Sequence, residues 1–156
     1  MTDHSPKIIF LDMDGVLNRI DPPHYFTPQR IIDGIMTQAE PEQIARLNSI
    51  VERTGAEIVL SSSWRHWNDW REAMRLSGIV KPLLDRTPTE KIETGERGYQ
   101  IQAWIHAHPE VVRYAIIDDS ADILPSQQPN FFQTRTAEGL TQDIADAVER
   151  HLSSPC

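Results

Sequence analysis

Short apolar runs alternate along this chain with stretches in which apolar residues recur at helical spacing. Three runs of about four residues are almost wholly apolar, the pattern of strands buried on both faces of a parallel sheet. They are Ile8–Leu11, Glu57–Leu60 and Tyr114–Ile117. A further strand is expected at Phe131–Thr134.

Helical periodicity predicts helices over residues 41–54, 64–76, 101–108 and 144–152. Pro41 suits the first turn of the first helix and Gly55 suits its end, while Pro109 stops the third. In the second helix, Trp67, Trp70 and Met74 have the spacing of a seam packed on a sheet. The proline-bearing intervals 18–40 and 79–97 are expected to be mostly loop, with a short strand near Ile79–Leu84 in the second.

Strands that alternate with helices in this way predict an α/β fold, a doubly wound parallel sheet flanked by helices. The length of 156 residues fits a single domain over residues 1–156.

Composition and charge exclude several classes of function and location. The net charge of −8 argues against non-specific binding of duplex nucleic acid. The single cysteine, Cys156, allows no internal disulfide, which favours a reducing, cytoplasmic compartment. The apolar run Ile8–Leu11 is too short for a signal-peptide core or a membrane span, so no membrane partner is expected.

Acids and hydroxyls follow three of the predicted strands. They are Asp12, Asp14, Ser61, Ser62, Asp118 and Asp119. In a doubly wound sheet the carboxyl ends of the strands form the ligand crevice, so these side chains should converge there. Clustered carboxylates repel one another in a low dielectric, and a hard divalent cation such as Mg²⁺ relieves that repulsion.

These strand ends resemble the motifs of the haloacid dehalogenase (HAD) superfamily. Phe10–Leu17 resembles its first motif, an apolar strand followed by Asp-x-Asp-Gly-Thr/Val. Ile58–Ser61 resembles the second motif and Ala115–Asp119 the fourth. The strand followed by Ser-Ser-Ser-Trp-Arg, together with the small size, is most similar to the HAD-type domains of RNA-repair proteins. The resemblance implies a Rossmann-like HAD core without a cap, because neither loop interval is long enough for an extra domain.

The resemblance also implies a Mg²⁺-dependent phosphatase, a phosphoric monoester hydrolase. Asp12 would be the nucleophile that forms an aspartyl-phosphate, and its second oxygen would bind the metal. Asp14 would protonate the leaving oxygen and then activate water, with its backbone carbonyl on the metal.

The remaining motif residues would bind phosphate and metal. Ser61, the first residue past its strand, or its neighbour Ser62 would contact a phosphoryl oxygen. The backbone at Gly15 would turn sharply and bring its amide near the phosphate. Asp119 would ligate the metal, with Asp118 close behind it.

The third motif of the superfamily is a Lys that holds the nucleophile and phosphate together. Here two cations compete for that position, Arg97 just before the helix at residues 101–108 and Lys91 further back in the loop. Either can neutralise phosphoryl oxygens, and Arg adds a bidentate fork.

Trp64 and Arg65 lie beside the second motif. They are either packing residues of the following helix or a substrate site that stacks a base and holds a phosphate. An uncapped site suits bulky substrates, so phosphorylated polynucleotide ends are the leading substrate hypothesis. The alternatives are a small-molecule or nucleotide phosphatase, and a catalytically weak module that binds phosphorylated partners.

Overall fold

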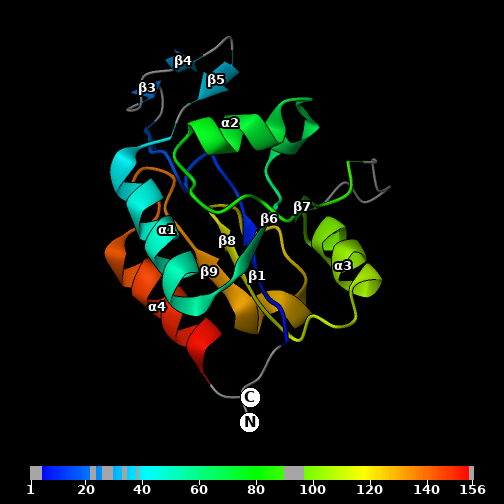
Figure 1. Ribbon diagram of the computed structural model, residues 1–156. Coiled ribbons are helices and arrows are strands. Elements are labelled where there is room, and N and C mark those ends of the chain that lie inside the picture. Colours follow the sequence, from blue (N-terminus) through cyan, green and yellow to red (C-terminus); the bar gives the residue numbers. More distant parts are fainter. Residues whose placement is uncertain are drawn as a thin grey trace.

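A five-stranded parallel sheet with the order β7-β6-β1-β8-β9 forms the centre of the protein (Figure 1). The computed structural model describes residues 5–21, 24–25, 30–32, 35–37, 39–89 and 97–154. The strands are β1 (Lys7–Leu11), β6 (Glu57–Leu60), β7 (Asp85–Arg86), β8 (Arg113–Asp118) and β9 (Phe131–Gln133). The predicted α/β fold and its parallel sheet are confirmed. The short strand expected near Ile79–Leu84 lies just beyond it, at β7.

The strand order reverses beside β1. From β1 the chain adds β6 and β7 on one side and later places β8 and β9 on the other. Leu11 pairs with Leu60 of β6 and with Ile117 of β8, so three strands end at the same level. This reversal opens the crevice in which ligands bind to doubly wound sheets.

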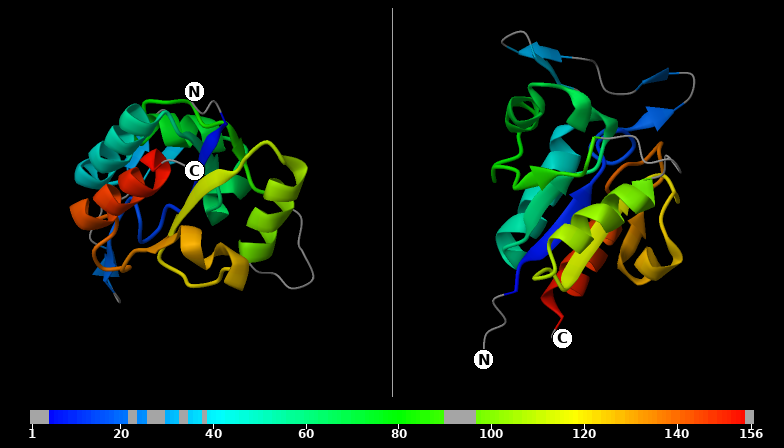
Figure 2. Two further views of the ribbon diagram at one scale, coloured as in Figure 1. Left: turned by 90° about the horizontal axis from the view of Figure 1, so that it is seen from below. Right: turned by 90° about the vertical axis from the view of Figure 1, so that its right-hand side faces the viewer.

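The alternation of side chains along β1 builds two hydrophobic cores, one on each face of the sheet. Ile9 and Leu11 pack with helices α1 (Pro41–Thr54), α2 (Trp70–Leu76) and α4 (Gln142–Ser153). Ile8 and Phe10 pack on the other face with α3 (Arg97–Ala107), where Phe10 meets the ring of Trp104 edge-on. Figures 1 and 2 show α1 and α4 side by side on one face and α3 on the other.

Local signals bound α1 as predicted, whereas α3 and α4 begin earlier than the predicted residues 101 and 144. Pro41 occupies the first turn of α1, and Gly55 closes it in a left-handed conformation with φ of 73°. The side chain of Thr141 caps α4 through the backbone N–H of Ile144. None of the helices in the described ranges combines the length and hydropathy of a membrane-spanning segment.

Two predicted elements differ in the structure. The helix expected over residues 64–76 is a 3₁₀ turn, η1 (Ser63–His66), followed separately by α2. The chain leaves the helical conformation at Trp67, whose φ of −75° and ψ of 139° are extended. Trp70 and Met74 pack in the core as the seam predicted, but Trp67 lies outside α2 and is 37% exposed.

The interval expected to be mostly loop contains two short antiparallel pairs. They are β2 (Ile20–Asp21) with β3 (His24–Tyr25), and β4 (Arg30–Ile32) with β5 (Ile35–Thr37). β-branched residues are frequent in β4 and β5 and favour strands, a signal that proline-based prediction overlooked. β5 contacts α2, near the carboxyl ends of the central strands (Figure 1). A 3₁₀ helix that was not predicted, η2 (Pro125–Asn130), precedes β9.

Candidate active site

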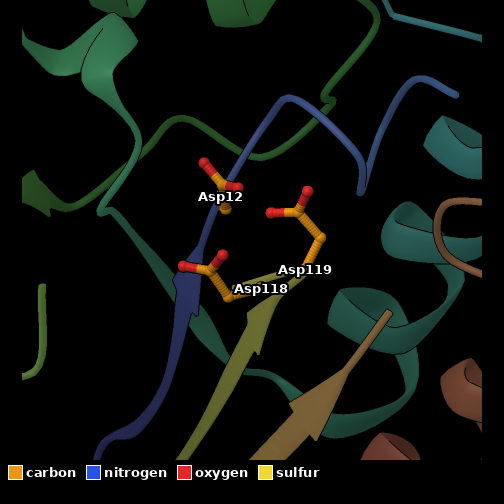
Figure 3. Close-up of side chains that lie close together, drawn as sticks. All are labelled: Asp12, Asp118 and Asp119. Carbon is orange, nitrogen blue, oxygen red and sulfur yellow. The ribbon is translucent and has the colours of Figure 1, made fainter. Parts of the chain in front are cut away.

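Three carboxylates converge at the carboxyl ends of β1 and β8 (Figure 3). Asp12 follows β1, Asp118 ends β8, and Asp119 is the next residue. One oxygen of each side chain lies within 4.8 Å of the others. Asp12 is only 5% exposed and Asp118 is fully buried. The strand ends therefore bring together three of the four acids that the sequence placed there, and the side chain of Asp14 is not part of this cluster.

Arg97 balances part of this negative charge. It is the first residue of α3, and its Nη1 lies 3.2 Å from Asp12 Oδ1 while also donating to Asp118 Oδ2. Its backbone N–H donates to Asp122 Oδ2, which anchors the start of the helix. Arg97 thus occupies the position from which a cation can reach both the predicted nucleophile and an incoming phosphoryl group. Lys91, the competing candidate, lies outside the described residues.

Burial and nearby negative charge oppose ionisation of Asp12 and Asp118. Burial, followed by the charge of Asp118, raises the pKa of Asp12 to about 8 even though Arg97 acts in the opposite direction. Burial likewise raises the pKa of Asp118. Closely spaced oxygen ligands that resist ionisation without a partner fit a hard divalent cation, which favours their charged forms. Asp12, Asp118 and Asp119 are therefore the side chains that could hold a metal ion.

The carboxylate of Asp14 is held on both sides. Asn18 Nδ2 donates to its Oδ1 at 3.0 Å, and the indole Nε1 of Trp64 donates to its Oδ2 at 3.2 Å. Asn18 was not singled out from the sequence. Its spacing of four residues from Asp14 in the turn that follows β1 is the signal that could have found it. The two donors fix the orientation of the group predicted to transfer protons.

Gly15 is required for packing against the acid cluster. Its φ is +80°, and a Cβ at this position would lie 2.4 Å from Asp119 Oδ2. Its amide was expected to face the phosphate, but the structure differs, because the N–H donates to Asn18 Oδ1 at 2.9 Å. The Gly15 carbonyl accepts from Thr134 Oγ1, and Thr136 Oγ1 donates to Asp119 Oδ2. Both threonines follow β9, a strand end that sequence reasoning did not search for site residues.

The structure distinguishes the two candidate serines. Ser61 Oγ is buried and has no hydrogen-bond partner among the described residues. Ser62 Oγ instead accepts the backbone N–H of Trp64 at 3.2 Å and caps η1. A buried hydroxyl without a partner is unfavourable unless a ligand supplies one, so of the two serines Ser61 is the one whose hydroxyl is left for a ligand. Ser62 Oγ is engaged as the cap acceptor but keeps its own hydrogen to donate, so its role in substrate binding stays a prediction.

Trp64 is also not available as a base-stacking surface. Its side chain is only 4% exposed, it holds Asp14, and its ring stacks on Trp67 at 4.7 Å between centroids. The structure therefore corrects the expectation that Trp64 stacks a base. Arg65 is equally buried and donates to the backbone carbonyls of Ser61 and Ser62. These hydrogen bonds hold the backbone of the second motif in place.

The sequence from residue 8 to residue 145 matches the family described as the HAD domain in Swiss Army Knife RNA repair proteins. The chain belongs to this family. The HAD domain is capless, since the described residues between β1 and α1 form only the short pairs β2–β3 and β4–β5. No curated protein matches the sequence. Among solved structures, the HAD domain is similar to a protein from Legionella pneumophila assigned to the subfamily III A hydrolases of the HAD superfamily. The two share 13% identity, with 95% of this chain and 82% of that chain covered and a TM-score of 0.45.

Proposed function

We propose that this HAD domain is a Mg²⁺-dependent phosphatase that acts on phosphorylated ends of RNA or DNA. One observation carries the proposal: the buried Asp12 lies within reach of Arg97 on one side and of the acids Asp118 and Asp119 on the other. A nucleophile, a fixed cation and a set of oxygen ligands are what phosphoryl transfer requires. Asp12, Asp119 and the backbone carbonyl of Asp14 would hold Mg²⁺, with Asp118 beside them. The ion would neutralise charge on the phosphoryl oxygens.

In the first chemical step, a carboxylate oxygen of Asp12 attacks phosphorus and the bond from phosphorus to the leaving oxygen breaks. Asp14, whose carboxyl group is oriented by Trp64 and Asn18, gives its proton to the leaving oxygen. The unpartnered hydroxyl of Ser61 and the guanidinium of Arg97 then stabilise the phosphoryl oxygens.

In the second step, Asp14 removes a proton from water, and the water oxygen attacks the phosphorus of the aspartyl-phosphate. The bond between phosphorus and Asp12 breaks, which releases inorganic phosphate and regenerates the carboxylate. The same carboxylic acid therefore serves first as acid and then as base.

Two observations support nucleic-acid ends as the substrate. The family is described from RNA repair proteins, and the site carries no cap domain that would exclude a long chain. The net charge of −8 implies that any contact with nucleic acid is local to the site rather than spread over the surface. We also propose a cytoplasmic location, because the single cysteine suits a reducing compartment.

A turnover screen tests the function. The protein is assayed with Mg²⁺ on oligonucleotides phosphorylated at the 3′ or 5′ end, mononucleotides, sugar phosphates and phosphopeptides, and again in excess EDTA. We expect hydrolysis of the oligonucleotides, its loss in EDTA, and a loss on the order of 10³-fold or more in Asp12→Asn. Full activity in EDTA, or Asp12→Asn turnover within about tenfold of wild type, would refute the mechanism. Preference for sugar phosphates or mononucleotides would identify a small-molecule phosphatase instead.

A further inference from the structure

A polar cavity of about 300 Å³ opens next to the catalytic residues. Its lining residues are Arg65, His66, Arg97, Gln100, Ser120 and Asp122. Arg97 belongs to both the cavity and the acid cluster, because its Nη1 contacts Asp12 and Asp118. A group bound in this cavity would therefore be separated from the phosphate being hydrolysed only by the guanidinium of Arg97.

Arg65 is an unusual residue for the wall of this cavity. It is 4% exposed, and its guanidinium donates only to backbone carbonyls: Nε to Pro88, and Nη1 to Ser61 and Ser62. No carboxylate of the described residues forms an ion pair with it, and its Nη2 has no acceptor within that part of the chain. A buried charge without a counter-ion is unfavourable, and an anion that enters the cavity would supply one.

Further positive charge surrounds Arg65. Arg86 Nη1 donates to the Arg65 backbone carbonyl, which places a second cation beside it. His66 lines the same cavity as a neutral ring, because burial and the charges of Arg65 and Arg86 lower its pKa. Burial, and then the charges of Arg97 and Arg86, lower the pKa of Arg65, while the charge of Asp12 acts in the opposite direction. Asp122 is the acid of the cavity wall, and its Oδ2 already accepts the backbone N–H of Arg97. The local charge is thus opposite to the net charge of the protein.

We propose that this cavity, which we call the Arg65 cavity, binds a second phosphate of the substrate, adjacent to the one that is removed. Arg65 Nη2 and the outer edge of Arg97 would donate to its oxygens, with His66 and Gln100 completing the wall. The inference rests on the proposed phosphatase function and narrows its substrate class. Substrates with two neighbouring phosphates would be preferred over simple monoesters. A nucleoside 3′,5′-bisphosphate and a polynucleotide end both have this chemistry.

Steady-state kinetics test the preference. Values of kcat/KM are compared for adenosine 3′-phosphate, adenosine 5′-phosphate, adenosine 3′,5′-bisphosphate and a dinucleotide phosphorylated at one end. We expect the two-phosphate substrates to be favoured on the order of 10- to 100-fold, the strength of one or two hydrogen bonds to a charged group. The bisphosphate and the dinucleotide distinguish a terminal monoester from a bridging diester as the second group.

Variants of the lining residues test whether the preference for two-phosphate substrates arises in the Arg65 cavity. Arg65→Gln removes the charge, and His66→Asp, at an exposed position, places a negative charge on the wall without touching the carbonyls that Arg65 supports. Both should lower the preference at least tenfold. His106→Asp makes the same charge change at an exposed position of α3 outside the cavity, and should leave it unchanged. A preference that survives both cavity variants would overturn the proposal.

Binding without metal separates this proposal from the proposed function. In EDTA the catalytic position lacks the metal ion that would hold a phosphoryl group there, so calorimetry with adenosine 3′,5′-bisphosphate reports binding in the Arg65 cavity. We expect binding by the wild type that is weakened at least tenfold in Arg65→Gln. If no substrate is hydrolysed but this binding is seen, the cavity assignment stands and the phosphatase assignment fails. Absence of binding, together with equal turnover of one- and two-phosphate substrates, would overturn the cavity assignment.

Discussion

The indole nitrogen of Trp64 donates a hydrogen bond to Asp14 Oδ2 at 3.2 Å, across 50 residues of sequence. Asn18 Nδ2 donates to the other oxygen from the turn after β1. The carboxylate that the proposed mechanism uses for proton transfer is therefore clamped between a local and a distant donor. Trp64 is a positioning residue in this arrangement, and its aromatic ring is buried behind the site.

Replacing Trp64 by Phe should separate orientation from packing. Trp64→Phe retains an apolar ring but removes the donor to Asp14, so kcat should fall on the order of 10-fold with little change in KM. The fall should be largest for an oligonucleotide and smallest for an aryl phosphate whose leaving group needs no proton. Trp67→Phe is the matched control, because the Trp67 ring stacks on Trp64 without reaching Asp14. Equal losses on both substrates would indicate a packing role only.

The cation of the third motif can be identified by a short series. Arg97→Ala should lower kcat on the order of 10²-fold or more, because its guanidinium neutralises Asp12 and the transferring group. Arg97→Lys should recover part of that loss, since the charge is kept while the fork is lost. Lys91→Ala should have little effect. A larger loss of kcat in Lys91→Ala than in Arg97→Ala would identify Lys91, and not Arg97, as the cation of the third motif.

The two serines should respond in opposite ways. Ser61→Ala removes a buried hydroxyl that has no partner among the described residues, so thermal stability should stay constant or rise while kcat/KM falls. Ser62→Ala removes the cap on η1 and should lower the free energy of unfolding by about 1 kcal/mol. Denaturant unfolding and turnover measured on both variants check this. Loss of stability in Ser61→Ala would mean that its hydroxyl is satisfied in solution.

Asp12 should make the metal-free protein less stable as pH rises. Its pKa of about 8 in the fold exceeds the ordinary value of 3.8, so between those values the unfolded chain has released a proton that the folded protein retains. The contribution of Asp12 to the free energy of unfolding is therefore most favourable below about pH 4. It falls as the pH rises to about 8 and then levels off.

Thermal unfolding in EDTA at several pH values measures this effect. Asp12→Asn cannot ionise, so its melting temperature should exceed that of the wild type at pH 8 by about 10 °C or more, at about 1.4 kcal/mol per unit of pKa difference and roughly 2–4 °C per kcal/mol. The difference should vanish near pH 4, and Mg²⁺ should reduce it by favouring the ionised Asp12 of the wild type. A wild type that gains stability relative to Asp12→Asn as pH rises would contradict the assigned burial.

Much of the fold follows from the sequence alone. The apolar run at Ile8–Leu11 and the helix from Pro41 to Gly55 could be predicted because hydrophobic period, proline and glycine act locally. The positions of Asp12 and Asp118 followed as well, since both lie where buried strands end. These features depend on residues that are close in the sequence, so the same strand, helix and strand-end positions form largely independently of the rest of the fold.

The roles of individual side chains were decided by tertiary structure. Ser61 and Ser62 are chemically identical, and only the start of η1 assigns one to a cap and leaves the other unpartnered. Trp64 lies in a sequence that suits stacking on a base, yet its buried indole donates to the partly buried carboxylate of Asp14. Which donor meets which acceptor depends on segments that are distant along the chain. Burial then decides the outcome, because a buried polar group needs a partner, either inside the protein, as for the Trp64 indole, or from a bound ligand, as for the Ser61 hydroxyl.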